Sequence, residues 1–424
     1  MSKVKVLVFP CGSENANEIY QALRYSVHVE LFGASSVDDC GKLIFDEYIG
    51  GLPNIKDDKF DGAFTSIIQK FDIDVVFATH DTVIDYLSTK AKKMGFYLVN
   101  GNETTTSITR KKSLTYQLFD NCEWIPKVFS NVEQLSDFPV IIKPDMGQGG
   151  QNIILANSQD DVKRSLDKVD LPLIVEYLPG EEITVDCFTD RHKNVIFIAP
   201  RTRERVKAGI TMRSQFLELT EELENIAKEI NNRLTLRGAW FFQMKRDKNG
   251  NWKLLEICCR IAGTMVAQRA RGVNLPLMII QDYLERDLVV LSNSSVNLIE
   301  RNIKTHTQLN FDYDTVFIDF DETLIIDGYA VPQVLAFLYQ EVKKGKKIKL
   351  ITRHKFDVLE TLKHAKIGLE LFDEIIQIDE KFLKSNYVTK NAIFIDNHFP
   401  ERLDVSLTHS IPVFDVDALE FFTT

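Results

Sequence analysis

VIIKPDMGQGG, residues 140–150, joins an apolar strand to a glycine-rich turn and indicates the fold of the middle of the chain. Lys143 ends the strand, and Gly147, Gly149 and Gly150 follow it. Such glycines leave backbone N–H groups free to approach phosphate oxygens, and the lysine adds a positive charge. The pattern is not the GxxxxGK[ST] loop, because no GK[ST] follows. By itself the stretch suits a hairpin turn with a surface lysine equally well.

Two later segments place acids and an amide near strand ends. VEYLPGEEITVD, residues 175–186, has acids on both sides of a Pro-Gly turn. In FQMKRDKNGNWKLLEICCR, residues 242–260, a Lys-Asn-Gly turn separates two strands, so that Gln243 and Glu256 can point toward the same cation. Magnesium bound to a triphosphate needs only one or two protein carboxylates. The segments therefore predict a site for a metal and a nucleotide.

In this order the motifs of residues 1–300 resemble ATP-grasp enzymes, similar to carbamoyl-phosphate-synthase-type proteins and other carboxylate–amine ligases, with their preceding α/β domain. The combination of motifs is highly specific. The resemblance implies ATP and Mg²⁺ as cofactors, with Mn²⁺ as a substitute. It also implies site residues: Lys112 and Lys143 on phosphate, Gly147, Gly149 and Gly150 in the phosphate-covering loop, Glu176 and the Leu178 backbone at the adenine, Glu182 at the ribose, Gln243 and Glu256 on metal, and Arg260 on the terminal phosphate and acyl phosphate.

Two positions depart from the family pattern. The family usually has Asn-Pro between the glutamate and the arginine, where this chain has Cys258 and Cys259. A thiol is a poor ligand for magnesium. Either Glu256 and water carry the coordination, or the ATP site is weakened.

Five cations lie between residues 201 and 213. They suit a solvated loop, or a site that holds an anionic substrate. In the second case Arg205 and Arg213 are the expected contacts.

VFIDFDETL, residues 316–324, carries a buried strand into two acids. Asp319 is expected to act as a nucleophile that forms an aspartyl phosphate, and Asp321 as general acid and then base. Thr352 ends a later strand and could hold phosphate, and a third strand ends at Asp396.

This set resembles the haloacid-dehalogenase-like (HAD) phosphatases over residues 312–424. The resemblance implies Mg²⁺ bound by Asp319, Asp321 (through its carbonyl) and Asp396. Lys381 is the favoured phosphatase lysine, with Lys384 close behind. The spacing between the motifs leaves no room for a large cap domain.

The length of 424 residues predicts two or three domains. The expected fold class is α/β and α+β: a Rossmann-like pre-ATP-grasp domain at 1–101, an ATP-grasp domain at 102–300, a linker at 301–311 and a HAD-like Rossmannoid domain at 312–424. The turn after the first strand has one glycine and not GxGxxG, so NAD binding is disfavoured.

The composition excludes several classes of protein. Lys+Arg 51 against Asp+Glu 61 gives a net charge of −10, which argues against a nucleic-acid coat. No apolar run is long enough to cross a bilayer. Six scattered cysteines without a CxxC spacing fit a reducing compartment, so a cytoplasmic location is expected.

The sequence thus predicts a bifunctional enzyme, an ADP-forming ligase joined to a phosphatase. Its expected partners are a small-molecule carboxylate, an amine and a phosphorylated substrate, and a homodimer is left open. Two alternatives remain for the first 300 residues: a kinase or other phosphotransferase, or a non-catalytic nucleotide-sensing module that regulates the phosphatase.

Overall fold

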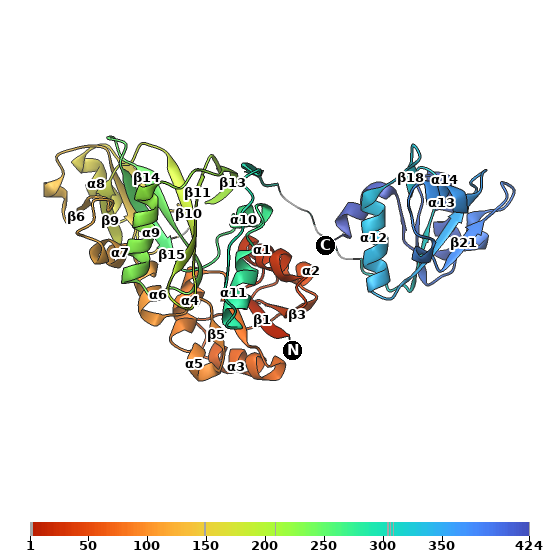
Figure 1. Cartoon of the computed structure of the whole chain (residues 1–424), viewed down its shortest axis with the longest axis horizontal. Coiled ribbons are helices and arrows are strands. Elements are labelled where there is room, and N and C mark those ends of the chain that lie inside the picture. Colours follow the sequence, from red (N-terminus) through yellow and green to blue (C-terminus); the bar gives the residue numbers. More distant parts are fainter. Residues whose placement is uncertain are drawn as a thin grey trace. The chain divides into compact units, whose positions relative to one another are not determined.

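The chain forms two compact units, Met1–Ile303 and Lys304–Thr424, which are described one at a time (Figure 1). It is a mixed α/β protein, as the sequence predicts. The computed structural model describes residues 3–147, 150–207, 209–302, 305, 307 and 309–423. Within those residues, no helix has both the length and the apolar character that a membrane span requires.

A parallel sheet of five strands, in the order β3-β2-β1-β4-β5, begins the first unit. β1 is an almost wholly buried apolar run, typical of a parallel sheet that is covered on both faces. Strands alternate with helices: β1 Val4–Phe9, α1 Glu14–Leu23, β2 Val29–Ala34, α2 Gly41–Ile44, β3 Glu47–Ile49, α3 Phe60–Phe71, β4 Val75–Ala78, α4 Asp81–Ser88, α5 Ala91–Met94 and β5 Tyr97–Leu98.

Two antiparallel sheets of four strands follow, in the orders β6-β9-β7-β8 and β11-β10-β14-β15. The segment that contains the first sheet comprises α6 Glu103–Arg110, α7 Lys112–Leu118, β6 Val128–Phe129, η1 Val132–Gln134, β7 Val140–Pro144, β8 Ile154–Ala156, α8 Gln159–Leu166 and β9 Pro172–Glu176. The second, with its flanking elements, comprises β10 Glu182–Thr189, β11 Val195–Thr202, α9 Glu221–Arg233, β14 Gly238–Arg246, β15 Trp252–Cys258, α10 Val266–Ala270 and α11 Leu275–Tyr283.

A small antiparallel sheet, β12-β13-β16, completes the first unit. Its strands are β12 Arg205–Lys207, β13 Ile210–Gln215 and β16 Leu298–Glu300. The last strand before the second unit is therefore hydrogen-bonded into the first.

One of the hydrophobic clusters of the first unit joins its parallel sheet to the later antiparallel sheet. Phe9 of β1 and Phe64 of α3 belong to the same cluster of buried side chains as Trp240 of β14. The boundary predicted at residue 101 therefore lies inside a compact unit, and it stays a prediction.

The second unit contains a parallel sheet of five strands in the order β21-β20-β17-β22-β23. The carboxyl ends of β17, β20 and β22 meet at one edge of this sheet. Its elements are β17 Thr315–Ile318, the hairpin strands β18 Ile325–Ile326 and β19 Tyr329–Ala330, α12 Pro332–Lys343, β20 Lys347–Thr352, α13 Val358–His364, η2 Leu369–Leu371, β21 Glu374–Gln377, η3 Lys384–Asn386, β22 Ala392–Ile395, α14 Phe399–His409, β23 Val413–Phe414 and η4 Val416–Phe421.

Candidate functional site

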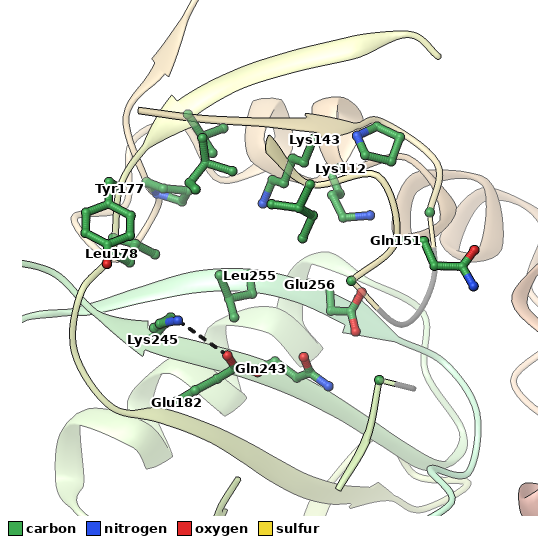
Figure 2. A pocket seen from close by; sticks show the side chains of 18 of the residues that line it. Lys112, Lys143, Gln151, Tyr177, Leu178, Glu182, Gln243, Lys245, Leu255 and Glu256 are labelled. Atoms are coloured by element: carbon green, nitrogen blue, oxygen red, sulfur yellow. Dashed lines mark ion pairs between the residues drawn. The ribbon is translucent and has the colours of Figure 1, made fainter. Parts of the chain in front are cut away.

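A cavity of about 390 Å³ lies between the two four-stranded sheets of the first unit. Figure 2 shows Lys112 and Lys143 on one side of it, facing Gln243 and Glu256 on the other. Nine of the predicted nucleotide and metal residues line the cavity: Lys112, Lys143, Gly147, Gly150, Glu176, Leu178, Glu182, Gln243 and Glu256. Gly149, the other member of that prediction, lies outside the described residues.

A buried carboxylate positions the two lysines. The Oδ1 atom of Asp145 accepts a hydrogen bond from the Ser113 N–H at 2.7 Å, and its Oδ2 atom accepts one from the Ser113 hydroxyl at 2.8 Å. The Asp145 carbonyl accepts from the Lys112 N–H at 3.2 Å. These bonds hold the first turn of α7 against the end of β7, so that Lys112 and Lys143 enter the cavity from the same side (Figure 2).

The ammonium group of Lys143 is buried, with 6% of the residue exposed. Its Nζ donates to the Tyr116 hydroxyl at 2.7 Å, and that hydroxyl donates to the Leu255 carbonyl at 2.9 Å. Burial, assisted by the nearby charge of Lys112, lowers the pKa of Lys143 to about 7. A phosphate group bound beside it would favour the charged form again.

Gln243 and Glu256 stand directly opposite one another in the β14–β15 pair, so their side chains share a face of the sheet. The turn between these strands is held by Asp247, whose Oδ1 atom accepts from the Asn249 N–H at 2.8 Å and the Asn251 N–H at 2.9 Å. Amide and carboxylate oxygens are donors that suit Mg²⁺. No group of three or more His, Cys, Asp or Glu side chains in the described part of the chain could hold a metal ion. The pair therefore fits a cation whose remaining ligands are phosphate oxygens and water.

Glu182 occupies the other end of the cavity between two cations. Arg203 Nε lies 2.6 Å from its Oε1 atom, and Lys245 Nζ lies 3.7 Å from its Oε2 atom, as the dashed line in Figure 2 shows. Arg203, one of the five cations between residues 201 and 213 considered for an anionic substrate, also lines the cavity. These cations hold the Glu182 carboxylate in place beside the cavity.

Apolar side chains form a slot next to Glu182, and they are Ile141, Ile153, Val175, Leu178 and Leu255. The Glu176 carboxylate accepts from the Lys127 N–H at 2.8 Å, which fixes the chain where β6 meets β9. A flat apolar ring would fit such a slot, with backbone groups of residues 176–178 along its edge.

Arg260 forms a bidentate ion pair with Asp81 at the start of α4. Its Nε and Nη2 atoms lie 2.7 Å and 2.9 Å from the Asp81 oxygens. The described residues that line the large cavity do not include Arg260. A much smaller hollow beside it is lined by Asp81, Glu256 and Cys258 among others, so this ion pair adjoins the metal-ligand candidate.

Cys258 is buried on β15, opposite Phe241. Burial raises the pKa of its thiol well above the ordinary value. A protonated thiol is a weaker magnesium ligand still than a thiolate, so the departure from the family pattern removes one oxygen donor.

Arg205 and Arg213, predicted as substrate contacts, form ion pairs within the small sheet. Arg213 lies 2.9 Å from Glu204 and 3.1 Å from Glu300, and Arg205 pairs with Glu300 as well. β16 pairs with β13 and places Glu300 opposite Arg213. Arg203 is the cation of this segment that lines the cavity, and the substrate role of Arg205 and Arg213 stays a prediction.

In the second unit, three predicted strand-end residues and a lysine converge. Lys384 Nζ lies 2.5 Å from Asp319 Oδ1 and 2.7 Å from Asp396 Oδ2, and all three residues are buried. Burial raises the pKa of Asp319, and the contact with Lys384 opposes that shift. Thr352 is buried at the end of β20, the strand next to β17.

Lys381, the lysine favoured from the sequence, is wrong for this position. It is exposed, and its Nζ lies 3.3 Å from Asp379. Lys384 takes the central place because η3 begins at that residue and turns its side chain inward. The Asp321 carboxylate lies outside this buried cluster, 2.8 Å from His354 Nδ1.

Several residues of both sites were missed from the sequence: Tyr116, Asp145, Asp81 and His354. Only Asp145 had a local signal, because it directly follows the Lys-Pro pair of the glycine-rich motif. The others reach their partners from distant segments.

Comparisons with known proteins agree with the ATP-grasp resemblance of the first unit. Residues 168–306 match a family model described as ATP-grasp in the biosynthetic pathway with Ter operon. A D-alanine–D-alanine ligase of Fusobacterium nucleatum is 31% identical over 97 residues, 23% of this chain and 34% of that protein. The arginine-specific large chain of carbamoyl phosphate synthase of Bacillus subtilis is 23% identical over 205 residues, 43% of this chain and 20% of that protein. The chain thus matches about a third or less of the length of these relatives.

Solved structures show the same architecture. The biotin carboxylase domain of the Hydrogenobacter thermophilus 2-oxoglutarate carboxylase, in complex with MgADP, ADP and bicarbonate, has a TM-score of 0.57 at 16% identity, over 70% of this chain and 73% of that one. The L-amino acid ligase of Bacillus licheniformis has a TM-score of 0.53 at 17% identity, over 67% of this chain and 74% of that one. The first unit therefore has the ATP-grasp fold.

Proposed function

From the ATP-grasp fold of the first unit, we propose that it is an ATP-dependent ligase which activates a carboxylate as an acyl phosphate for attack by an amine or a similar nucleophile. The observation that carries this proposal is the cavity in which Lys112 and Lys143 face Gln243 and Glu256. Positive charge on one wall and metal-type oxygen donors on the other suit a triphosphate held between them. The ligase relatives support the choice of reaction class.

Each part of the cavity has a role in this reaction. The apolar slot takes the adenine, Glu182 accepts hydrogen bonds from the ribose, and the two lysines hold the phosphates. Mg²⁺, held by Gln243 and Glu256, would neutralise phosphate charge when bound. Arg260, oriented by Asp81, faces the charge that develops as the terminal phosphoryl group passes to the carboxylate oxygen. Positioning and charge neutralisation of this kind supply most of the catalysis in phosphoryl transfer.

The test is ATP turnover by the whole chain with Mg²⁺ and pools of carboxylates and amines, followed by mass spectrometry. ADP, phosphate and a condensed product are expected. Formation of ADP and a phosphorylated acceptor, without an amide product, would show that the first unit is a kinase and not a ligase. ATP that binds without turnover would favour a nucleotide-sensing module, which Cys258 in place of an oxygen ligand motivates.

For the second unit we propose a Mg²⁺-dependent phosphatase of the HAD type. The contact of Lys384 with both Asp319 and Asp396 at the ends of two adjacent strands supports it. Two neighbouring carboxylates are a suitable donor set for Mg²⁺, which would offset phosphate charge when bound. Asp319 attacks phosphorus, Asp321 protonates the departing alcohol oxygen, and Asp321 then takes a proton from the water that hydrolyses the aspartyl phosphate.

Hydrolysis of phosphate esters by the whole chain, with and without Mg²⁺, tests this second activity. Asp319→Asn should abolish it, because an amide cannot form the phosphoenzyme. Hydrolysis that survives in the Asp319→Asn variant would refute the proposed nucleophile.

A further inference from the structure

Asp321 differs from the other acids of the second unit's site in its exposure. Its side chain is 54% exposed, whereas Asp319 and Asp396 are buried. An exposed carboxylate can adopt several rotamers, yet a group that transfers a proton must lie within hydrogen-bond reach of the reacting oxygen. Something must therefore hold Asp321 in place.

The imidazole of His354 contacts both oxygens of that carboxylate. His354 Nδ1 lies 2.8 Å from Asp321 Oδ1 and 3.1 Å from Asp321 Oδ2. The ring packs edge-on against Phe320, with centroids 5.0 Å apart, and against Phe356 at 5.6 Å. The backbone is fixed as well, because the His354 N–H donates to Thr352 Oγ1 at 2.9 Å. His354 is thus an anchored side chain beside a mobile acid.

A second contact holds the other ring nitrogen. Thr361 Oγ1 lies 3.0 Å from His354 Nε2 and 3.0 Å from the Asp357 carbonyl oxygen, and its hydroxyl can donate to either one. The contact between Nε2 and Thr361 ties the ring to α13 and sets the plane and tilt with which Nδ1 meets Asp321.

We propose that His354 is a positioning residue which aims the Asp321 carboxyl at the leaving-group oxygen. The inference rests on the proposed phosphatase function of the second unit. It concerns geometry: the imidazole does not touch the substrate but restricts the rotamers of the group that does. The chain from α13 through Thr361 and His354 to Asp321 supplies the rigidity that the exposed acid lacks.

A merely structural role is the competing explanation, because the ring also fills space between Phe320 and Phe356. The two roles differ in their dependence on the leaving group. An alkyl alcohol needs a proton to depart, whereas p-nitrophenolate departs without one. If the ring only fills space, its loss would slow formation of the aspartyl phosphate from both esters alike. If the ring orients Asp321, its loss would slow that step far more for the alkyl ester.

The experiment compares p-nitrophenyl phosphate with glycerol 2-phosphate in the full chain with Mg²⁺. His354→Phe keeps an aromatic ring and removes the hydrogen bonds. Asp321 also takes a proton from water in the second step, which the two esters share, so the comparison uses kcat/KM, which reports formation of the aspartyl phosphate. We expect kcat/KM on glycerol 2-phosphate to fall by about 10–100-fold, and kcat/KM on p-nitrophenyl phosphate by less than about threefold. His354→Asn, which keeps an N–H near the position of Nδ1, should recover part of the difference. The control is His364→Phe, which replaces an exposed histidine at the end of α13 and should leave both rates unchanged.

Each result decides something. Equal losses on the two esters, or no loss on either, in a folded His354→Phe variant would overturn the inference while the phosphatase proposal stands. No hydrolysis by the unaltered chain, or full hydrolysis by Asp319→Asn, would overturn the phosphatase proposal and the inference with it. A thermal unfolding curve identifies a variant that has lost its fold. In that event Thr361→Val, which leaves the imidazole in place and removes the hydroxyl that contacts Nε2 and the Asp357 carbonyl, must show the same selective loss on the alkyl ester.

Discussion

Lys143 combines two opposing demands in one side chain. It must be buried to meet phosphate in a dry cavity, and burial disfavours its charge. The lowered pKa of about 7 expresses that conflict, since an ordinary lysine has a value of 10.5. The free protein therefore loses stability at a group that the proposed function assigns to phosphate binding.

Lys143→Met should remove both the destabilisation caused by burying the lysine and the ATP turnover proposed for this site. We expect ATP turnover to be lost and the free energy of unfolding at pH 7 to rise by about 1 kcal/mol or more, since one pKa unit corresponds to roughly 1.4 kcal/mol. Between pH 7 and 10.5 the unfolded wild-type chain binds more protons than the folded one, so wild-type stability rises with pH. The advantage of the methionine variant should shrink over that window. Urea unfolding at several pH values measures it, and an advantage that grows with pH would contradict this account.

Lys384 and Lys381 form a matched pair for the second unit. Lys384→Met should lower phosphate-ester hydrolysis by at least about 100-fold. It should also destabilise the unit by about 3–5 kcal/mol, because it leaves two buried carboxylates without their cation. Lys381→Met removes an exposed charge and should change neither property. Steady-state kinetics and thermal unfolding of both variants provide the check, and the reverse pattern would restore the lysine predicted from the sequence.

The residues of the first site were largely predictable from sequence, and some charged ones were not. Lys143 ends a short apolar strand, and Gln243 and Glu256 stand in two strands joined by a short turn, which pairs them on one face of their sheet. Lys381 and Lys384 stand in a loop without such a period, so the pattern cannot say which one turns inward. Arg213 depends on Glu300, whose strand lies far along the chain.

At the scale of elements, the Pro-Gly turn joins the two walls of the nucleotide cavity. Gly180 packs against the β14 backbone: an added Cβ would lie 2.6 Å from the Arg246 Cβ and 3.1 Å from the Arg246 carbonyl oxygen. The turn carries Leu178 on one side and Glu182 on the other, and both line the cavity.

Gly180→Ala should therefore displace the turn and weaken nucleotide binding. We expect Kd to rise by about tenfold, which corresponds to a loss of about 1.4 kcal/mol in binding free energy. The control is Gly250→Ala in the β14–β15 turn. Its Cβ would meet nothing within 4 Å, and its φ of +84° adds backbone strain alone. That variant should lose about 1 kcal/mol of stability and keep its affinity. Titration calorimetry with ADP and Mg²⁺ distinguishes the two variants. Equal affinities of the two variants for ADP would show that the position of the Pro-Gly turn does not affect binding.

Most strands are predictable because they are short runs rich in apolar residues, as β1, β15 and β20 are. α3 also carries a local signal, since Phe60, Phe64 and Ile68 are buried at helical spacing. β12 and β13 had no such signal, since their charged residues owe their conformation to β16. Pairing with a distant strand is decided by tertiary structure and not by local pattern.

For the whole molecule, we expect the proposed site of each unit to work without the other. Asp319→Asn should abolish phosphate-ester hydrolysis and leave ATP consumption within about twofold, because the substitution removes one nucleophile and retains the side-chain volume. Glu256→Gln should do the opposite. Parallel assays of both activities on each purified variant measure this, and loss of both activities from either substitution would contradict independence.

The poised charge of Lys143 also has a consequence for the heat of binding. Near neutral pH a fraction of the free protein carries Lys143 uncharged, and a bound polyphosphate raises its proton affinity. Nucleotide binding should therefore take up protons from the buffer. The enthalpy observed by calorimetry should differ between phosphate and Tris buffers in proportion to their ionisation enthalpies. This dependence should vanish in Lys143→Arg, where the side chain stays charged throughout.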